Sequence, residues 1–241
     1  MKKIFLLILF IVIYQITYSI FPIKNYLPSI PDILSGVVKN FSDKYIYNHI
    51  FASLQRVLVG FLLATITGVS LGILIGHNKY LHGLKFYIEL LRPIPPIAWI
   101  PIAIMIFGLG DRSAYFIVFL GALFPIFTNT YFGVISLPAI YRNVALSFEL
   151  SKFTYITRVV FFYSLPYIFT GLKIGIGMAW MSVIAAELIG SQSGLGYFIQ
   201  LNRLLLQTDN VIIGMILIGI MGYLLNKLIA FVEKIAIRWK T

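Results

Sequence analysis

The chain has 241 residues, of which 60% are hydrophobic and 11% are charged, and its formal net charge is +11. An ordinary globular domain is about 45 to 50% apolar and about 25% charged. The composition therefore excludes a water-soluble fold and indicates an all-α polytopic membrane protein. The absence of cysteine excludes disulfides, thiol catalysis and cysteine-ligated metals. The basic residues lie scattered in short loops between apolar segments, which is typical of membrane topology and not of nucleic-acid binding.

Six apolar stretches reach or approach the roughly 20 helical residues that cross a hydrocarbon core about 30 Å thick. They lie near residues 4–21, 54–76, 86–110, 113–136, 164–190 and 210–232. The sequence therefore predicts about six transmembrane helices. With the Met-Lys-Lys end inside, thirteen of the 19 Lys and Arg residues fall inside and six outside, which predicts that both termini are cytoplasmic. The outside set is Lys24, Lys39, Lys44, Arg56, Arg112 and Arg203.

Residues 1–51 are expected to hold the first transmembrane helix and an outer amphipathic segment. The opening, MKKIFLLILFIVIYQITYSIF, also resembles a signal peptide, with Thr17 and Ser19 as a cleavage pair. An uncleaved span is favoured because the apolar stretch is longer than a usual signal core and no Ala-x-Ala site follows. After Pro31 and Asp32, apolar residues recur at helical spacing and predict a short helix on the outer membrane surface.

The third predicted span contains the proline-rich segment RPIPPIAWIP. Proline removes backbone donors, so irregular backbone at this depth must be buried in protein or face a water-filled cavity. We expect a rigid bend near a polar pathway, with a purely structural bend as the alternative. The candidates for pathway or helix-packing roles are Arg92, Pro93, Pro95, Pro96 and Trp99. Glu89 and Arg92, spaced i, i+3, can form an ion pair at the membrane interface.

The segment between the fourth and fifth spans, Tyr141 to Ile168, is longer than a simple connection needs. We predict a cytoplasmic location and a short helix. Its polar face would comprise Asn143, Ser147, Ser151 and Thr154. Leu146, Leu150 and Phe153, at i, i+4 and i+7, would leave an apolar strip in the cytosol. The strip either rests on the bilayer or fills a groove on another protein.

The fifth span carries Lys173 and Glu187, and a charge at the bilayer centre costs roughly 2.5 to 3.5 kcal/mol on insertion scales. These residues are about 21 Å apart along a helix, so each needs a different partner. Glu187 either lines a pathway or bonds a neighbouring helix, and Lys173 is expected to snorkel toward the cytoplasmic interface. Gly171 and Gly175 form a small-xxx-small face that allows close helix approach.

Separated blocks of the chain resemble the permease subunits of binding-protein-dependent ABC transporters, in particular the subgroup that imports sulfonates, taurine and nitrate. In order, the blocks are ASLQRVLVGF, LLRPIPPIAWIPIAIMIFGLGD and RVVFFYSLPYIFTGLKIGIGMAWMSVIAAELIGSQSGLGYFI. The resemblance covers about residues 52–238 and implies a permease domain with the type I importer (MetI-like) fold. It also implies that residues near 140–158 form the loop that couples the permease to its ATPase.

In that family the coupling loop carries Glu-Ala-Ala, a Gly six residues beyond the Glu, and later a Pro. Alignment on RVV and LPYI puts Asn143 at the motif Glu, Val144 and Ala145 at the Ala positions, and Glu149 at the Gly. The motif's acidic charge is therefore missing, and a turn that needs positive φ is put in question. The resemblance assigns the ATPase contact to Arg142, Asn143, Val144, Ala145, Ser147, Phe148, Glu149, Leu150, Ser151, Lys152 and Phe153.

The resemblance implies a non-catalytic, metal-free permease of a bacterial or archaeal cytoplasmic (inner) membrane. Two copies in contact with membrane lipid would form the pathway for a small anionic solute. Cytoplasmic ABC ATPase subunits would bind ATP and Mg²⁺, and an extracytoplasmic solute-binding protein would deliver the solute. The chain has no GxxxxGK[ST] motif. The alternatives are a secondary transporter or channel and a membrane scaffold, but both leave the ordered blocks unexplained.

Overall fold

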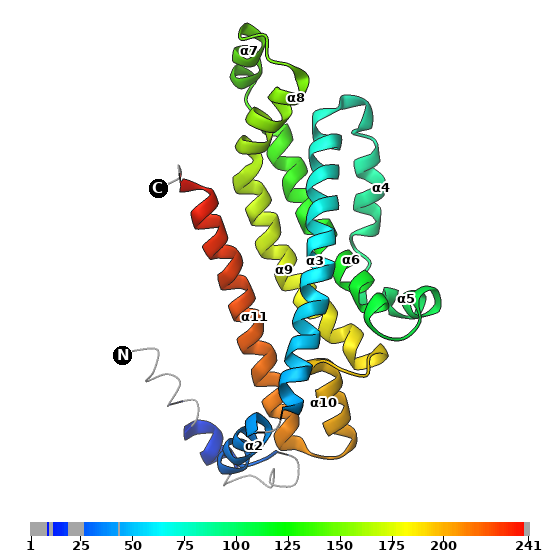
Figure 1. The fold of residues 1–241 in the computed structure, drawn as a ribbon, viewed down its shortest axis with the longest axis vertical. Coiled ribbons are helices and arrows are strands. Elements are labelled where there is room, and N and C mark those ends of the chain that lie inside the picture. The colour runs from blue at the N-terminus through cyan, green and yellow to red at the C-terminus, as the bar shows by residue number, and fades with distance from the viewer. Residues whose placement is uncertain (1–8, 10–11, 19–26, 43, 239–241) are drawn as a thin grey trace.

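The computed structural model describes residues 9, 12–18, 27–42 and 44–238. In that part of the chain every regular element is a helix, which confirms the all-α class. Four helical segments are long and apolar enough to cross a membrane, and they run along the long axis of the molecule in Figure 1. They are α3 (Tyr45–His77), α6 (Asp111–Ile135), the segment Lys152–Gly190 and α11 (Thr208–Ala236). The first predicted span, near 4–21, lies largely outside the described residues.

The stretch 86–110, counted above as one span, consists of two helical parts. These are α4 (Leu84–Leu91) and a second part formed by η2 (Pro96–Trp99) and α5 (Ile100–Phe107), bent by 90° relative to each other. Pro95 is extended, and the neighbouring prolines have no N–H with which to continue the helix. The predicted bend is therefore confirmed. In Figure 1, α4 runs beside α3 whereas α5 turns sideways.

Helix α6 packs against both α3 and α9 (Phe161–Gly190), and small residues bring the three backbones close together. A Cβ atom on Gly60 of α3 would lie 2.6 Å from the Val118 side chain of α6. On α9, Cβ atoms on Gly171 and Gly175 would each lie 3.0 Å from Ile126 of α6. The close approach predicted for the small-xxx-small face is confirmed, and its partner is α6.

One end of the molecule is closed by two short helices, α2 (Ile30–Ser42) and α10 (Leu195–Leu204). Helix α2 confirms the helix predicted after Pro31 and Asp32. Its start is capped reciprocally, because Ser29 N–H donates to the Asp32 carboxylate at 3.0 Å and Asp32 N–H donates to Ser29 Oγ at 3.3 Å. Bonding to Ser29 lowers the pKa of the Asp32 carboxyl below its ordinary value. Asn40 anchors α2 to α11 by donating to Asn210 Oδ1 at 2.6 Å.

The opposite end carries η1 (Lys79–Leu81) between α3 and α4, and the connection between α6 and α9. That connection contains α7 (Ala139–Ser147), α8 (Lys152–Thr154) and the π-helical segment η3 (Tyr155–Val160), which continues into α9. Figure 1 places α7 and α8 at the end opposite α2 and α10. The loops predicted to share one side of a membrane thus lie at one end of the molecule.

Candidate functional site

Helices α7 and α8 form a projection beyond the ends of the long helices (Figure 1). Apolar side chains cover its tip: Leu146 is 66% exposed, Phe148 74% and Phe153 78%. The sequence predicted Leu146, Leu150 and Phe153 on an exposed strip, and the structure confirms that all three are exposed. In contrast, Ala145 is buried and anchors α7.

The projection is two helices joined by a turn, which corrects the expectation of one continuous helical face. Helix α7 ends in a Schellman motif, in which Leu150 N–H donates to Ala145 O at 3.1 Å and Glu149 N–H donates to Leu146 O at 3.0 Å. Ser151 then caps α8 by accepting from Thr154 N–H at 3.2 Å. Ser147 and Ser151 consequently belong to different helices.

Glu149 occupies the position in this turn where glycine is usual. Its φ is +50°, in the left-handed region that costs an L-residue about 1 to 2 kcal/mol. The turn that the Gly-to-Glu departure put in question does form, with Glu149 at the strained position.

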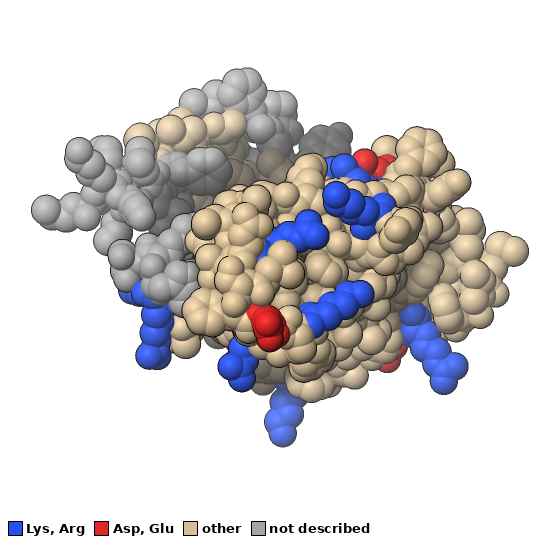
Figure 2. All heavy atoms as spheres, turned by 90° about the horizontal axis from the view of Figure 1, so that it is seen from above, with Lys and Arg blue, Asp and Glu red and all other residues tan. Residues whose placement is uncertain are grey.

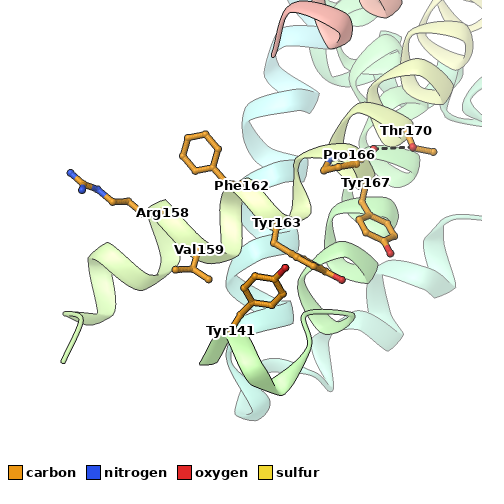
Figure 3. Close-up of a pocket in the computed structure, with 8 residues that line it drawn as sticks. All are labelled: Tyr141, Arg158, Val159, Phe162, Tyr163, Pro166, Tyr167 and Thr170. Carbon is orange, nitrogen blue, oxygen red and sulfur yellow. Dashed lines mark hydrogen bonds between the residues drawn. The ribbon is translucent and has the colours of Figure 1, made fainter. Parts of the chain in front are cut away.

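A cavity of about 760 Å³ lies between α7 and the start of the long helix that follows it. Figure 3 shows the Tyr141 ring next to that of Tyr163, whereas Arg158 points away from the tyrosines. The two ring centroids are 5.5 Å apart, and Tyr163 OH donates to Ser136 O at 3.1 Å. This cavity separates part of α7 from α9, and the contact between the Tyr141 and Tyr163 rings bridges the two helices.

Basic side chains are more widespread than acidic ones at this end of the molecule, as Figure 2 shows from above. Lys79, Arg142 and Lys152 line a second cavity of about 810 Å³ between the α3–α4 connection and the projection. No acidic residue is among the described residues of its lining. The projection therefore combines an apolar tip with a cationic base.

At the opposite end, Arg56 of α3 is the centre of a buried ion cluster. Arg56 is 3% exposed, and Glu187 of α9 is 1% exposed. Arg56 Nη1 donates to Glu187 Oε1 at 2.9 Å, and Arg56 Nε donates to Asp111 Oδ1 at 2.8 Å. Nη1 and Nη2 also donate to the carbonyl and hydroxyl oxygens of Ser193 at 2.6 and 2.7 Å. One guanidinium therefore connects α3, α6, α9 and the segment before α10.

The N-terminus of α10 completes the bonding of the Glu187 carboxylate. Gly196 N–H donates to Oε2 at 2.9 Å, and Ser53 Oγ lies 2.8 Å from both carboxylate oxygens. Gly194, with φ +106°, packs so closely on this carboxylate that a Cβ atom would overlap it. Of the two roles left open for Glu187, this geometry favours bonding between helices.

Sequence reasoning missed the centre of this cluster. Arg56 was counted only as an outer charge, and Asp111 and α10 were not predicted at all. The sequence did contain a signal for this pair. Glu187 required a cationic partner, and Arg56 is the basic residue within the second apolar stretch, near 54–76.

The structure gives Lys173 and Glu89 ion-pair partners that differ from the sequence-based expectations. Lys173 donates to Glu233 Oε2 of α11 at 2.9 Å, so it is paired and does not snorkel alone. Glu89 pairs with Lys85 at 3.3 Å, one turn back on α4, so the Glu89–Arg92 pair is wrong. In the described residues, Arg92 takes part in none of the ion pairs.

The proline-rich break places its candidate residues in two environments. Arg92, Pro93 and Pro95 are exposed, whereas Pro96 and Trp99 are half-buried. Arg92 and Pro96 line a cavity of about 170 Å³ against α6 and α9. Trp99 packs instead on the apolar cluster around Ile100. Arg92 and Pro96 thus line a cavity, whereas Trp99 contributes to the packing of helices.

Residues 64–240 match the family described as "Binding-protein-dependent transport system inner membrane component". The chain belongs to this family. The permease is 43% identical over 199 residues to the nitrate import permease protein NrtB of Synechocystis sp., covering 81% of this chain and 72% of that protein. It is 40% identical over 198 residues to the bicarbonate transport system permease protein CmpB of Synechococcus elongatus, covering 81% and 71%.

The fold of the permease matches a solved structure of the MetNI methionine ABC transporter in an inward-facing conformation. The TM-score is 0.70 at 16% sequence identity, with 80% of this chain and 96% of that chain covered. The predicted MetI-like fold is therefore confirmed. The chain is a transmembrane permease subunit of an ABC importer. The two other classes considered, secondary transporter or channel and scaffold, are set aside.

Proposed function

We propose that the permease spans a bacterial or archaeal cytoplasmic membrane with the α7 end in the cytoplasm. The support is the concentration of Lys and Arg at that end (Figure 2), because short cytoplasmic loops carry an excess of these residues. By the same excess of Lys and Arg on the cytoplasmic side, both termini are assigned to the cytoplasm.

The projection formed by α7 and α8 is the element that engages a separate ABC ATPase. Its tip exposes Leu146, Phe148 and Phe153 beyond the ends of the long helices, which suits a helix seated in a groove of a partner. Asn143 supplies no acidic charge, so this docking is mainly apolar. ATP and Mg²⁺ are held by the ATPase, and two copies of the permease form the pathway.

The solute is a small anion that an extracytoplasmic binding protein delivers. The observation that carries this assignment is the identity of 43% and 40% to permeases named for nitrate and bicarbonate. Sulfonates and taurine belong to the same range of small, charged solutes.

The direct test is transport by the complete importer, with the permease, its ATPase and its binding protein reconstituted in proteoliposomes. We expect nitrate uptake that requires both ATP and the binding protein and that competes with bicarbonate or taurine if these share the site. The variant Phe153→Asp should abolish ATP-driven uptake while the permease remains folded. Uptake driven by an ion gradient without ATP would contradict the proposal.

A further inference from the structure

Arg92 occupies an unusual place for a charged residue. It directly follows α4 and precedes the proline-rich break. The cavity that it lines is also formed by Phe124 and Pro125 of α6 and by Ile174 and Met178 of α9. Those residues lie near the middle of their long helices. The Arg92 cavity is therefore at the depth of the membrane centre and not at either surface.

Arg92 also differs from Arg56 and Lys173 in having no counter-charge among the described residues. Arg56 is paired with two carboxylates and Lys173 with one. In the described part of the chain, no carboxylate lies within 4.0 Å of the Arg92 guanidinium, and no hydrogen bond from it is found. An exposed, unpaired guanidinium at this depth is unfavourable against lipid and is tolerated where it faces water or an anion.

From this arrangement we propose that Arg92 is the anion-binding residue of the transport pathway, inside the membrane. The inference rests on the proposed function, because it assumes that the pathway carries a small anion. Broken helices are places where membrane transporters expose polar groups to a solute near the bilayer centre. The guanidinium presents its donors in a planar fork, which matches the oxygen atoms of nitrate, bicarbonate, a carboxylate or a sulfonate.

The other lining side chains set the size of the solute. The cavity of about 170 Å³ has room for roughly five water molecules, since each takes about 30 Å³ in the liquid. Phe124, Ile174 and Met178 are apolar and leave Arg92 as the charged group of the described lining. A small oxyanion fits this combination of size and charge, whereas a peptide is too large for it.

The first test uses the complete importer in proteoliposomes with nitrate as the probe. We expect Arg92→Gln to lower the initial rate of ATP-driven nitrate uptake by about tenfold or more, the order expected for losing a hydrogen bond to a charged group. Arg92→Lys keeps the charge and should retain an intermediate rate. The matched control is Lys227→Gln, which removes a basic residue of α11 outside the cavity and should transport like the wild type.

ATP hydrolysis in the same vesicles separates a pathway role from a structural one. Hydrolysis stimulated by the loaded binding protein should persist in Arg92→Gln, because the projection and the ATPase are unchanged. Equal nitrate uptake by Arg92→Gln and the wild type would overturn the inference. So would a parallel loss of uptake and hydrolysis that Arg92→Lys does not rescue, because that pattern indicates a packing role.

The second test does not depend on transport and exploits the absence of cysteine from the chain. Ile94→Cys lines the same cavity and keeps Arg92. In closed vesicles it should react with a small anionic methanethiosulfonate reagent, and nitrate should slow the reaction unless Arg92→Gln is added. If the wild type takes up no nitrate, the proposed function fails, and this labelling alone decides whether the Arg92 cavity faces water. A position-94 thiol that is inert to the reagent, or that reacts at a rate unaffected by nitrate while Arg92 is present, would overturn the assignment of Arg92.

Discussion

Each charged residue of the Arg56 cluster has its own bonding partners and its own degree of burial. Arg56 and Glu187 would each be costly to bury alone, but the carboxylate accepts from Arg56, Ser53 and Gly196. Asp111 differs because its side chain is 56% exposed, so water already solvates it. The contribution of each residue to stability should therefore follow its burial.

Arg56→Met is expected to lower the free energy of unfolding by about 3 to 5 kcal/mol, because it leaves the Glu187 carboxylate buried without a cation. Asp111→Asn should cost far less, since exposed ion pairs contribute about 0 to 1 kcal/mol. Thermal unfolding in detergent measures both variants. The double variant Arg56→Met/Glu187→Leu should be less destabilised than the sum of the single ones, and simple additivity would contradict direct coupling.

The strained turn of the projection gives a second residue-scale prediction. Glu149→Gly should stabilise the α7–α8 connection by up to about 1 kcal/mol, because glycine adopts positive φ without steric cost. Glu149→Ala is the matched control, since it removes the carboxylate but keeps the Cβ atom. Resistance of the projection to limited proteolysis should rise for the glycine variant and not for the alanine variant. An equal rise in resistance for both variants would show that loss of the carboxylate, and not the positive φ, controls the stability of this turn.

At the scale of the elements, the sequence predicts what depends on local pattern and misses what depends on distant contacts. Apolar length identified α6 and α11, and the prolines identified the bend before α5. Helix α10 was missed because its N-terminus is fixed by Glu187 and Ser53, which are distant in sequence or in another helix. The end of α7 was missed because Glu149 adopts a conformation that its residue type disfavours.

The packing of α3 on α6 can be tested with a pair of glycine substitutions. Gly60→Ala should destabilise the permease, because the new Cβ atom would lie 2.6 Å from Val118 and 2.8 Å from the Tyr115 carbonyl oxygen. Gly177→Ala on α9 meets no atom within 4 Å and gains about 1 kcal/mol of helix propensity. The midpoint of thermal unfolding should fall for the first variant and hold or rise for the second. A fall in both would contradict specific close packing.

Over the whole molecule, the two ends differ in how firmly they are held. At the α10 end, buried ions and asparagine contacts tie helices together, whereas at the other end α7 and α8 expose apolar side chains. An end held by buried bonds and a projection with exposed apolar side chains would suit alternating access, in which movement of the projection shifts the equilibrium between two states. The family and the long helices α3, α6, α9 and α11 were predictable from the sequence, but the paired Lys173 and the unpaired Arg92 required the three-dimensional arrangement.

The proposed engagement of the ATPase by the projection can be tested by crosslinking. Ser147→Cys, at the end of α7, and Leu204→Cys, at the end of α10, are matched single thiols in a chain without cysteine. In inverted membrane vesicles with the co-expressed ATPase subunit, we predict a crosslink at position 147 that changes with ATP, and none at position 204. A position-147 thiol that an impermeant reagent labels freely but that never crosslinks to the ATPase would contradict the account.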